Sequence, residues 1–164
     1  AGTGLYMGKA RNGAEYAVMN LQGRTFMATL DDPFRKVEEL LAQIPDRIKV
    51  RFIDFHAEAT SEKVAFGWHL DGRVTAVVGT HTHIPTADER VLPGGTAYQT
   101  DVGMTGSYAG VIGVEKGPII RKFQTALPMR MEAAKGMVEL HATIVTADPE
   151  TGKAVRIRRY EVKE

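Results

Sequence analysis

Hydrophobic and polar positions along the chain predict strands and helices that alternate over its first part. Short apolar runs rich in β-branched and aromatic residues indicate strands, and apolar positions three or four apart indicate amphipathic helices. Asp31 or Asp32 can cap the first helix, and Thr60 or Ser61 can cap the second. The predicted strands cover residues 15–21, 48–55, 74–78 and 96–101, and the predicted helices cover residues 33–44 and 60–68.

The pattern changes in the last third of the chain. Pro118 predicts the start of a helical turn. From about residue 127, three alternating apolar and polar runs, separated by residues 134–136 and 148–152, predict an antiparallel meander. Strand–helix units followed by consecutive strands predict a mixed α/β layered fold.

Length and composition describe one ordinary globular domain. The chain has 164 residues, of which 43% are hydrophobic and 25% charged. It contains no cysteine, which excludes disulfide scaffolds, Cys-ligated zinc, iron–sulfur clusters and thiol nucleophiles. A net charge of +1 gives no strong field for a polyanion. No apolar run approaches the ~18 residues of a membrane span, so we expect a cytoplasmic protein with no membrane partner.

Three histidines follow predicted strands. His56 comes after the strand that ends at residue 55, and His81 and His83 come shortly after the strand that ends at residue 78. Ligands of open α/β sheets gather outside the carboxyl ends of the strands, so these imidazoles could converge on one crevice. His81 and His83 are two apart, and in an extended segment they would project to the same side, where each could bind a different ion of a two-metal site.

The other two histidines favour structural roles. His141 alternates with apolar residues inside the predicted meander, which indicates a solvent-facing strand position. His69 lies near a predicted helix end, where its imidazole can bond free carbonyls or interact with the helix dipole.

Four carboxylates lie in or shortly after the predicted strands. Asp54 and Asp101 could each orient a metal-bound imidazole or cap a neighbouring turn. Glu58 and Glu62 are four apart, as on the solvated entrance of a helix. The chain contains neither a phosphate-binding P-loop nor a dinucleotide fingerprint, and no serine stands in the Gly-x-Ser-x-Gly context of acyl-serine hydrolases.

Six segments of the chain form a specific pattern: Asn20–Phe26, Leu30–Phe34, Asp54–Lys63, Gly79–His83, Thr86–Asp88 and Thr100–Gly106. The stretch around His56 is far more specific than a lone His-x-His. These segments closely resemble the YmdB-like branch of the calcineurin-like metallophosphoesterases, and the resemblance runs through nearly the whole chain.

The resemblance implies a four-layer α/β/β/α sandwich of the metallo-dependent phosphatase type that encloses a dinuclear centre. Carried over residue by residue, His56 and His81 would bind one metal and His83 the other. The two ions would be iron or manganese, both compatible with imidazole and carboxylate ligands. The implied activity is hydrolysis of phosphodiesters such as 2′,3′-cyclic nucleotides. We expect a small nucleotide phosphodiester as substrate, with RNA as a further candidate, and separately a homo-oligomeric assembly.

The chain also departs from this family. Members of the family begin with a strand that carries a metal-binding Asp, followed by Gly-Glu-Asn and Gly-Asn-His segments that supply further ligands and the proton-donating His, and none of these motifs occurs here. We therefore expect residues 1–164 to be the C-terminal part of a single metallophosphoesterase domain. No catalytic residue is assigned within them, because the proton donor is expected upstream, and we expect that this chain alone does not complete the site.

Two other functions remain open at this point. One is a non-catalytic metal- or nucleotide-binding module that regulates RNA or a partner protein, which would bind its ligand without turnover. The other is a mononuclear hydrolase, because three imidazoles and a water molecule make a recognised zinc site.

Overall fold

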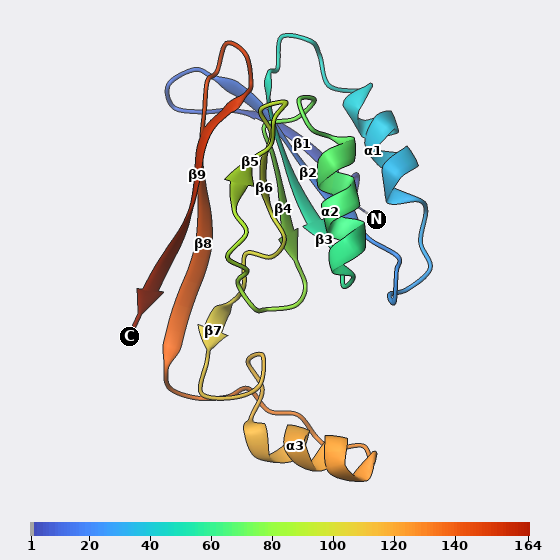
Figure 1. Cartoon of the computed structure of the whole chain (residues 1–164), viewed down its shortest axis with the longest axis vertical. Helices are drawn as coiled ribbons and strands as arrows, with labels where there is room; N and C mark the ends of the chain where they lie inside the picture. The colour runs from blue at the N-terminus through green and yellow to red at the C-terminus, as the bar shows by residue number, and fades with distance from the viewer. Residues whose placement is uncertain (1) are drawn as a thin grey trace.

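The computed structural model describes residues 2–164 as two sheets with two helices packed on the larger sheet and a third helix set apart (Figure 1). Within the described part of the chain, no helix has the length and apolar character needed to cross a membrane. The strands are β1 (Leu5–Lys9), β2 (Glu15–Gln22), β3 (Val50–His56), β4 (Ala76–Thr80), β5 (Arg90–Val91), β6 (Ala97–Gln99), β7 (Thr105–Ser107), β8 (Val138–Ala147) and β9 (Ala154–Lys163), and the helices are α1 (Pro33–Leu41), α2 (Thr60–His69) and α3 (Lys116–Thr125).

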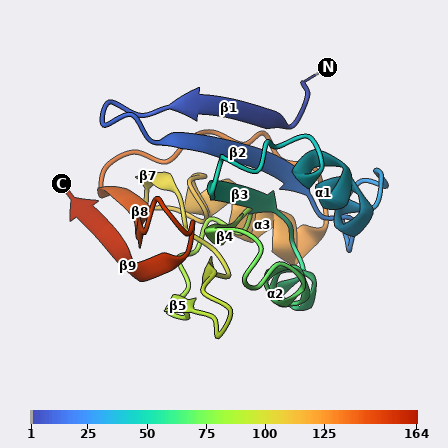
Figure 2. The ribbon, with the colours of Figure 1, turned by 90° about the horizontal axis from the view of Figure 1, so that it is seen from above.

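The larger sheet has the strand order β1-β2-β3-β4-β6-β5 (Figures 1 and 2). Its central strands β2, β3, β4 and β6 are parallel, and the edge strands β1 and β5 are antiparallel to their neighbours. The carboxyl ends of the four parallel strands therefore lie along one edge of the sheet, which is where an open α/β sheet places its ligands.

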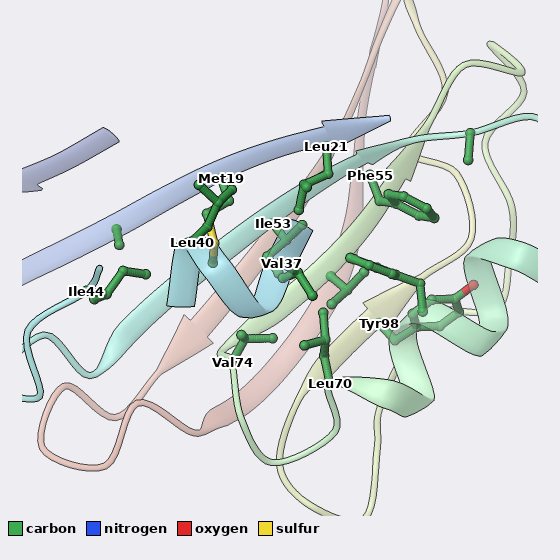
Figure 3. Close-up of a cluster of buried hydrophobic side chains, with 14 of the residues drawn as sticks. Met19, Leu21, Val37, Leu40, Ile44, Ile53, Phe55, Leu70, Val74 and Tyr98 are labelled. Atoms are coloured by element: carbon green, nitrogen blue, oxygen red, sulfur yellow. The ribbon is translucent and has the colours of Figure 1, made fainter. Parts of the chain in front are cut away.

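The main core lies between this sheet and the helices α1 and α2 (Figure 3). Alternate residues of β2 and β3 face the helices, as the two-residue period of a strand requires. Phe55 of β3 stacks on Phe66 of α2 with ring centroids 4.1 Å apart, and Phe34 of α1 meets Phe66 edge to face at 5.2 Å. These contacts fix α2, and with it the loop after His56, against the sheet.

The smaller sheet, β7-β8-β9, packs on the opposite face of the larger one. Its strand β9 contributes Ala154 and Ile157 to a second cluster with Ala76 and Ala97 of the larger sheet. Helices, larger sheet and smaller sheet thus form three successive layers, which confirms the expected mixed α/β fold. Residues 2–164 do not supply a second helical layer on the outer face of the smaller sheet, as the four-layer α/β/β/α sandwich would have. Helix α3 lies beyond the end of the smaller sheet and not across its outer face (Figure 1).

Two expectations about local structure are wrong. The run that begins near residue 127 forms no strand: residues 126–132 are irregular, and the third strand of the meander is β7, which pairs with β8. Leu127 is 58% exposed and finds no sheet to join, so alternation alone did not make a strand there. At α2 the N-cap is Ala59 without a side-chain bond, whereas Asp32 caps α1 as predicted, by accepting from the Phe34 amide.

Candidate metal centre

His56 and His81 lie at the carboxyl edge of the parallel strands. β3 ends at His56, and in the parallel register His56 stands beside Thr80, the last residue of β4. His81 follows immediately, so the register itself brings the two imidazoles together. This confirms that residues from two neighbouring strand ends meet at one place.

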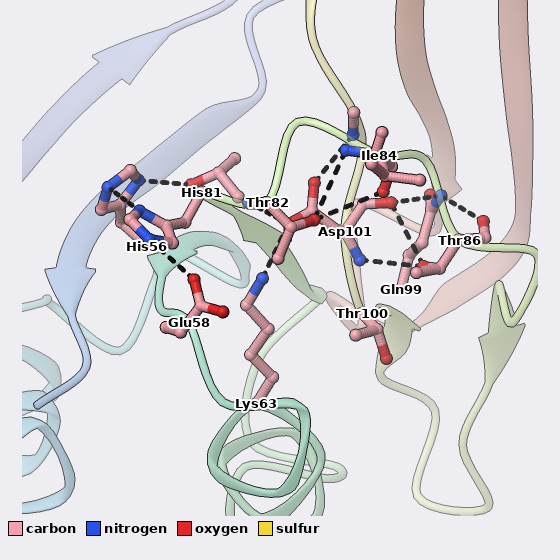
Figure 4. Close-up of polar contacts among 12 residues, drawn as sticks. His56, Glu58, Lys63, His81, Thr82, Ile84, Thr86, Gln99, Thr100 and Asp101 are labelled. Carbon is pink, nitrogen blue, oxygen red and sulfur yellow. Dashed lines mark hydrogen bonds and ion pairs between the residues drawn. The ribbon is translucent and has the colours of Figure 1, made fainter. Parts of the chain in front are cut away.

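The two rings are in direct contact (Figure 4). His81 Nδ1 lies 3.0 Å from His56 Nε2, and the rings meet nearly at right angles with centroids 4.7 Å apart. On its other side, His81 Nε2 lies 2.9 Å from Glu58 Oε2. Glu58, expected on a solvated helix entrance, therefore pairs with one of the candidate ligands.

A chain of hydrogen bonds assigns the tautomer of His56. The Thr80 hydroxyl donates its hydrogen to Asp54 Oδ1 at 2.8 Å. The Thr80 oxygen Oγ1 therefore accepts from His56 Nδ1, which lies 3.1 Å from it. The other oxygen of Asp54 accepts from Asn20 Nδ2 at 2.8 Å. His56 therefore carries its hydrogen on Nδ1 and presents the lone pair of Nε2. Asp54 orients His56 through Thr80 and not by direct contact.

The pKa of His56 lies below its ordinary value of 6.5. Burial is the largest cause, because it disfavours the charged ring, and the neighbouring His81 acts in the same direction. The carboxylate of Asp54 opposes both but does not outweigh them. These surroundings favour the neutral imidazole, the form that binds a metal ion.

The His83 ring does not join the contact between the His56 and His81 rings. Its Nδ1 lies 2.9 Å from the Ile112 carbonyl, and its own carbonyl accepts from the Tyr108 hydroxyl at 3.3 Å. His81 and His83 have φ angles of 111° and 66°, which are uncommon for residues other than glycine and cost on the order of 1–3 kcal/mol each. The expectation that the pair projects from a simple extended segment is therefore wrong, because the loop turns at both residues.

Residues 2–164 contain no group of three or more His, Asp or Glu side chains placed to hold a metal ion together. The donors that do meet are imidazole nitrogens, with a carboxylate beside them. This donor chemistry fits a metal that accepts nitrogen and oxygen ligands.

The prediction for His141 is wrong. Its imidazole is only 10% exposed and lies 2.9 Å from Glu139, with the Tyr108 ring centroid 4.9 Å away. The reason is the orientation of β8: the face that carries His141 and Thr143 turns towards the larger sheet, where Thr143 bonds Gln99.

Two more side chains form contacts that their sequence positions did not indicate. His69 Nε2 lies 2.9 Å from Glu38 Oε1 on α1, so it bonds a neighbouring helix and not the carbonyls of its own. Glu62, expected to be solvated, accepts from the backbone amides of Arg24 and Thr25 at 3.1 and 3.2 Å.

Sequence reasoning missed Lys63. Its side chain is 1% exposed and its ammonium lies 2.7 Å from Asp101 Oδ2, directly behind the histidine loop (Figure 4). A lysine in an amphipathic helix is ordinarily exposed, so position gave no signal. The only hint was that Lys63 ends the specific segment that begins at Asp54.

The chain is similar to several known proteins. The family model described as YmdB-like protein matches residues 1–160. The chain is 55% identical over 163 residues to the 2′,3′-cyclic-nucleotide 2′-phosphodiesterase of Bacillus subtilis (strain 168), an alignment that covers 99% of this chain and 61% of that protein.

Two crystal structures share its fold. One is of a hypothetical protein from Thermus thermophilus, with a TM-score of 0.93, 43% identity, and coverage of 99% of this chain and 63% of the other. The second is of a novel phosphatase from Mycoplasma pneumoniae, with a TM-score of 0.89, 34% identity, and coverage of 99% and 58%. The chain thus spans about three fifths of the length of these proteins.

Proposed function

The chain belongs to the YmdB-like family, and on this basis we propose that it supplies the three-histidine part of a metal-dependent phosphodiesterase. The substrate class we propose is 2′,3′-cyclic nucleotides or related phosphodiesters, because the Bacillus subtilis relative is named for hydrolysis of such nucleotides. RNA remains a further candidate substrate, and cytoplasmic location and homo-oligomeric assembly remain predictions.

One observation carries the proposal. His56 and His81 come from neighbouring parallel strand ends and approach to 3.0 Å between ring nitrogens. The bonds from Asp54 through Thr80 leave Nε2 of His56 without a hydrogen, so the half-buried ring presents a lone pair. An imidazole held in one tautomer by a second group is the usual arrangement of a metal ligand.

In this proposal His56 and His81 would hold one ion and His83 a second, with iron or manganese as the metals. When bound, such ions generate a nucleophile from water and offset negative charge on a phosphoryl group. The residues of this chain supply the positions: Asp54 and Thr80 orient His56, and Glu58 lies against the far side of His81.

The test uses the natural polypeptide that carries this chain, at its full length, with 2′,3′-cyclic AMP as substrate. His81→Ala and His83→Ala should each lower turnover by orders of magnitude and lower the metal content found by elemental analysis. His69→Ala is the matched control, because this imidazole bonds Glu38 on the surface of the helices, and it should leave both quantities unchanged.

Near-normal turnover with metal retained in His81→Ala and His83→Ala would contradict the proposal. Tight nucleotide binding without turnover in the unmodified protein would favour a regulatory module. One metal per chain in an active enzyme would favour a mononuclear site.

A further inference from the structure

Lys63 and Asp101 form an ion pair in the interior, directly behind the loop that carries His81 and His83 (Figure 4). The two side chains are 1% and 0% exposed, and the ammonium nitrogen lies 2.7 Å from Asp101 Oδ2. Because desolvation of both charges offsets much of their attraction, a buried pair is a weak source of stability. What the pair holds in place is therefore more informative than its strength.

The carboxylate of Asp101 holds two backbone amides as well as Lys63. Oδ2 accepts from the Thr82 amide at 3.0 Å, and Oδ1 accepts from the Gly103 amide at 2.9 Å. Thr82 is the residue between His81 and His83. The carboxylate thus bonds the backbone at the residue that is next to both histidines in the chain.

The backbone around Thr82 has an uncommon conformation that a hydrogen bond can stabilise. His81 and His83 both have positive φ angles, and a non-glycine residue keeps that conformation only where its surroundings enforce it. The Thr82 amide lies between these two turns, and Asp101 is the group that bonds it. Asp101 is itself fixed, because its amide donates to the Thr86 hydroxyl at 2.9 Å.

Lys63 connects this loop to the segment of His56. It projects from the first turn of α2, which begins four residues after His56. The ion pair and the Asp101–Thr82 hydrogen bond together therefore link the segment after β3 to the loop after β4. Gly79 of β4 allows the backbone of Thr100, the residue before Asp101, to lie close to β4, since a Cβ at position 79 would overlap the Thr100 carbonyl.

We infer that Lys63 and Asp101 are positioning residues, which set the places of His81 and His83 by holding the Thr82 amide. This inference rests on the proposed metal-binding role of the histidines. The carboxylate fixes the loop through its hydrogen bond to the Thr82 amide, and the lysine supplies the partner of opposite charge that a buried carboxylate needs.

The experiment measures binding of Mn²⁺ alone to the full-length natural protein, by calorimetry and by the electron paramagnetic resonance spectrum of the bound ion. The main variant is Lys63→Met combined with Asp101→Leu, which removes both charges together and so leaves no unpaired ion in the core. A second variant combines Lys63→Met with Asp101→Asn and keeps one oxygen to accept a backbone amide. The control combines Glu38→Gln with Arg73→Met, which removes an ion pair beyond the other end of α2.

The Leu variant should keep the far-ultraviolet circular dichroism of a folded protein and bind Mn²⁺ about 10- to 100-fold more weakly, with an altered resonance spectrum. The Asn variant should fall between the Leu variant and the unmodified protein, and the control should bind as the unmodified protein does. Unchanged affinity and spectrum in the Leu variant would overturn the inference. If the Leu variant does not fold, the Asn variant decides in the same way, since unchanged Mn²⁺ binding there would also overturn it.

His81→Ala separates this inference from the proposed function. If His81→Ala weakens Mn²⁺ binding and the Lys63 and Asp101 variants do not, only the positioning role fails. If His81→Ala itself leaves Mn²⁺ binding unchanged, the proposed metal centre fails with it.

Discussion

Two regions of the molecule differ in how much of their side-chain surface is buried. One is the set of loops at the carboxyl edge of the larger sheet, and the other is the segment of residues 108–137 that carries α3, called the excursion below. At the sheet edge Gln99, Thr100 and Asp101 are buried. Their side chains bond Thr86, Asp88 and Thr82 of the loop after β4. In the excursion, α3 has no buried residue and Phe123 is 79% exposed. The excursion is held together by backbone hydrogen bonds, such as the one that the Glu115 amide donates to the Glu132 carbonyl.

The difference indicates which region of the molecule can hold a functional side chain in one position. His81 belongs to the first region, since the amide of its neighbour Thr82 is held by a buried carboxylate. His83 faces both regions, because its ring meets the Ile112 carbonyl of the excursion. We therefore expect substitutions at the sheet edge to change stability strongly and matched substitutions in the excursion to change it little.

The largest contrast is expected from one substitution made in both regions. Gly79→Ala places a Cβ against the Thr100 carbonyl, so it should lower the free energy of unfolding by about 3 kcal/mol or more. Gly117→Ala in α3 meets open space and should raise it by up to about 1 kcal/mol, because alanine has the higher helix propensity. Urea unfolding of both variants measures the contrast. Equal effects of the two substitutions would break the comparison.

A smaller contrast is expected from loss of a hydroxyl. The Thr100 hydroxyl donates to Asp88 and lies 3.0 Å from the Tyr98 hydroxyl, and of these partners Tyr98 is buried and Asp88 half-buried. Although burial raises it, hydrogen bonds from Thr100 and Thr86 hold the pKa of Asp88 below its ordinary value. Thr100→Val should therefore cost about 1–3 kcal/mol in thermal or urea unfolding.

The control for Thr100→Val is Thr125→Val in α3. The Thr125 hydroxyl donates to the Arg121 carbonyl in an exposed position, so its loss should change stability by less than about 0.5 kcal/mol. A cost at Thr125 as large as that at Thr100 would contradict the distinction between the two regions.

The smallest effect is expected from a surface ion pair, which sharpens the contrast between exposed and buried charges. Arg73 and, after it, His69 lower the pKa of Glu38 from 4.5 to about 2. Its folded pKa is depressed, so its contribution is present above pH 4.5 and disappears as the pH falls towards 2. Because Glu38 is 46% exposed, that contribution should be less than about 1 kcal/mol.

Glu38→Gln measures this contribution. The variant should be slightly less stable than the unmodified protein at pH 7, and the two melting curves should converge as the pH approaches 2. A stability difference that persists unchanged at pH 2 would show that Glu38 does not act through its charge.

The sequence predicted the parallel strands and their helices because burial imposes clear periods on them. Phe55 and Val37 lie in the core as their spacing indicated. β1 escaped prediction because an edge strand needs few apolar residues, and its pattern includes exposed Tyr6 and Met7. The strand expected near residue 127 failed for the converse reason, since alternation predicts a strand only where a partner strand is available.

Some features of the candidate site could likewise be predicted from the sequence and others could not. The convergence of His56 and His81 could be predicted, because parallel strands place their carboxyl ends together. The buried Lys63, the inward face of His141 and the separate direction of His83 could not, since each depends on contacts between segments far apart in sequence.

The most direct test of the proposed centre is a crystal structure of the full-length natural protein soaked in Mn²⁺, with anomalous diffraction measured for manganese. The account predicts anomalous density within roughly 2–2.5 Å of His56 Nε2 and of His81, and a second peak at the His83 ring. Manganese density found only away from all three imidazoles would contradict it.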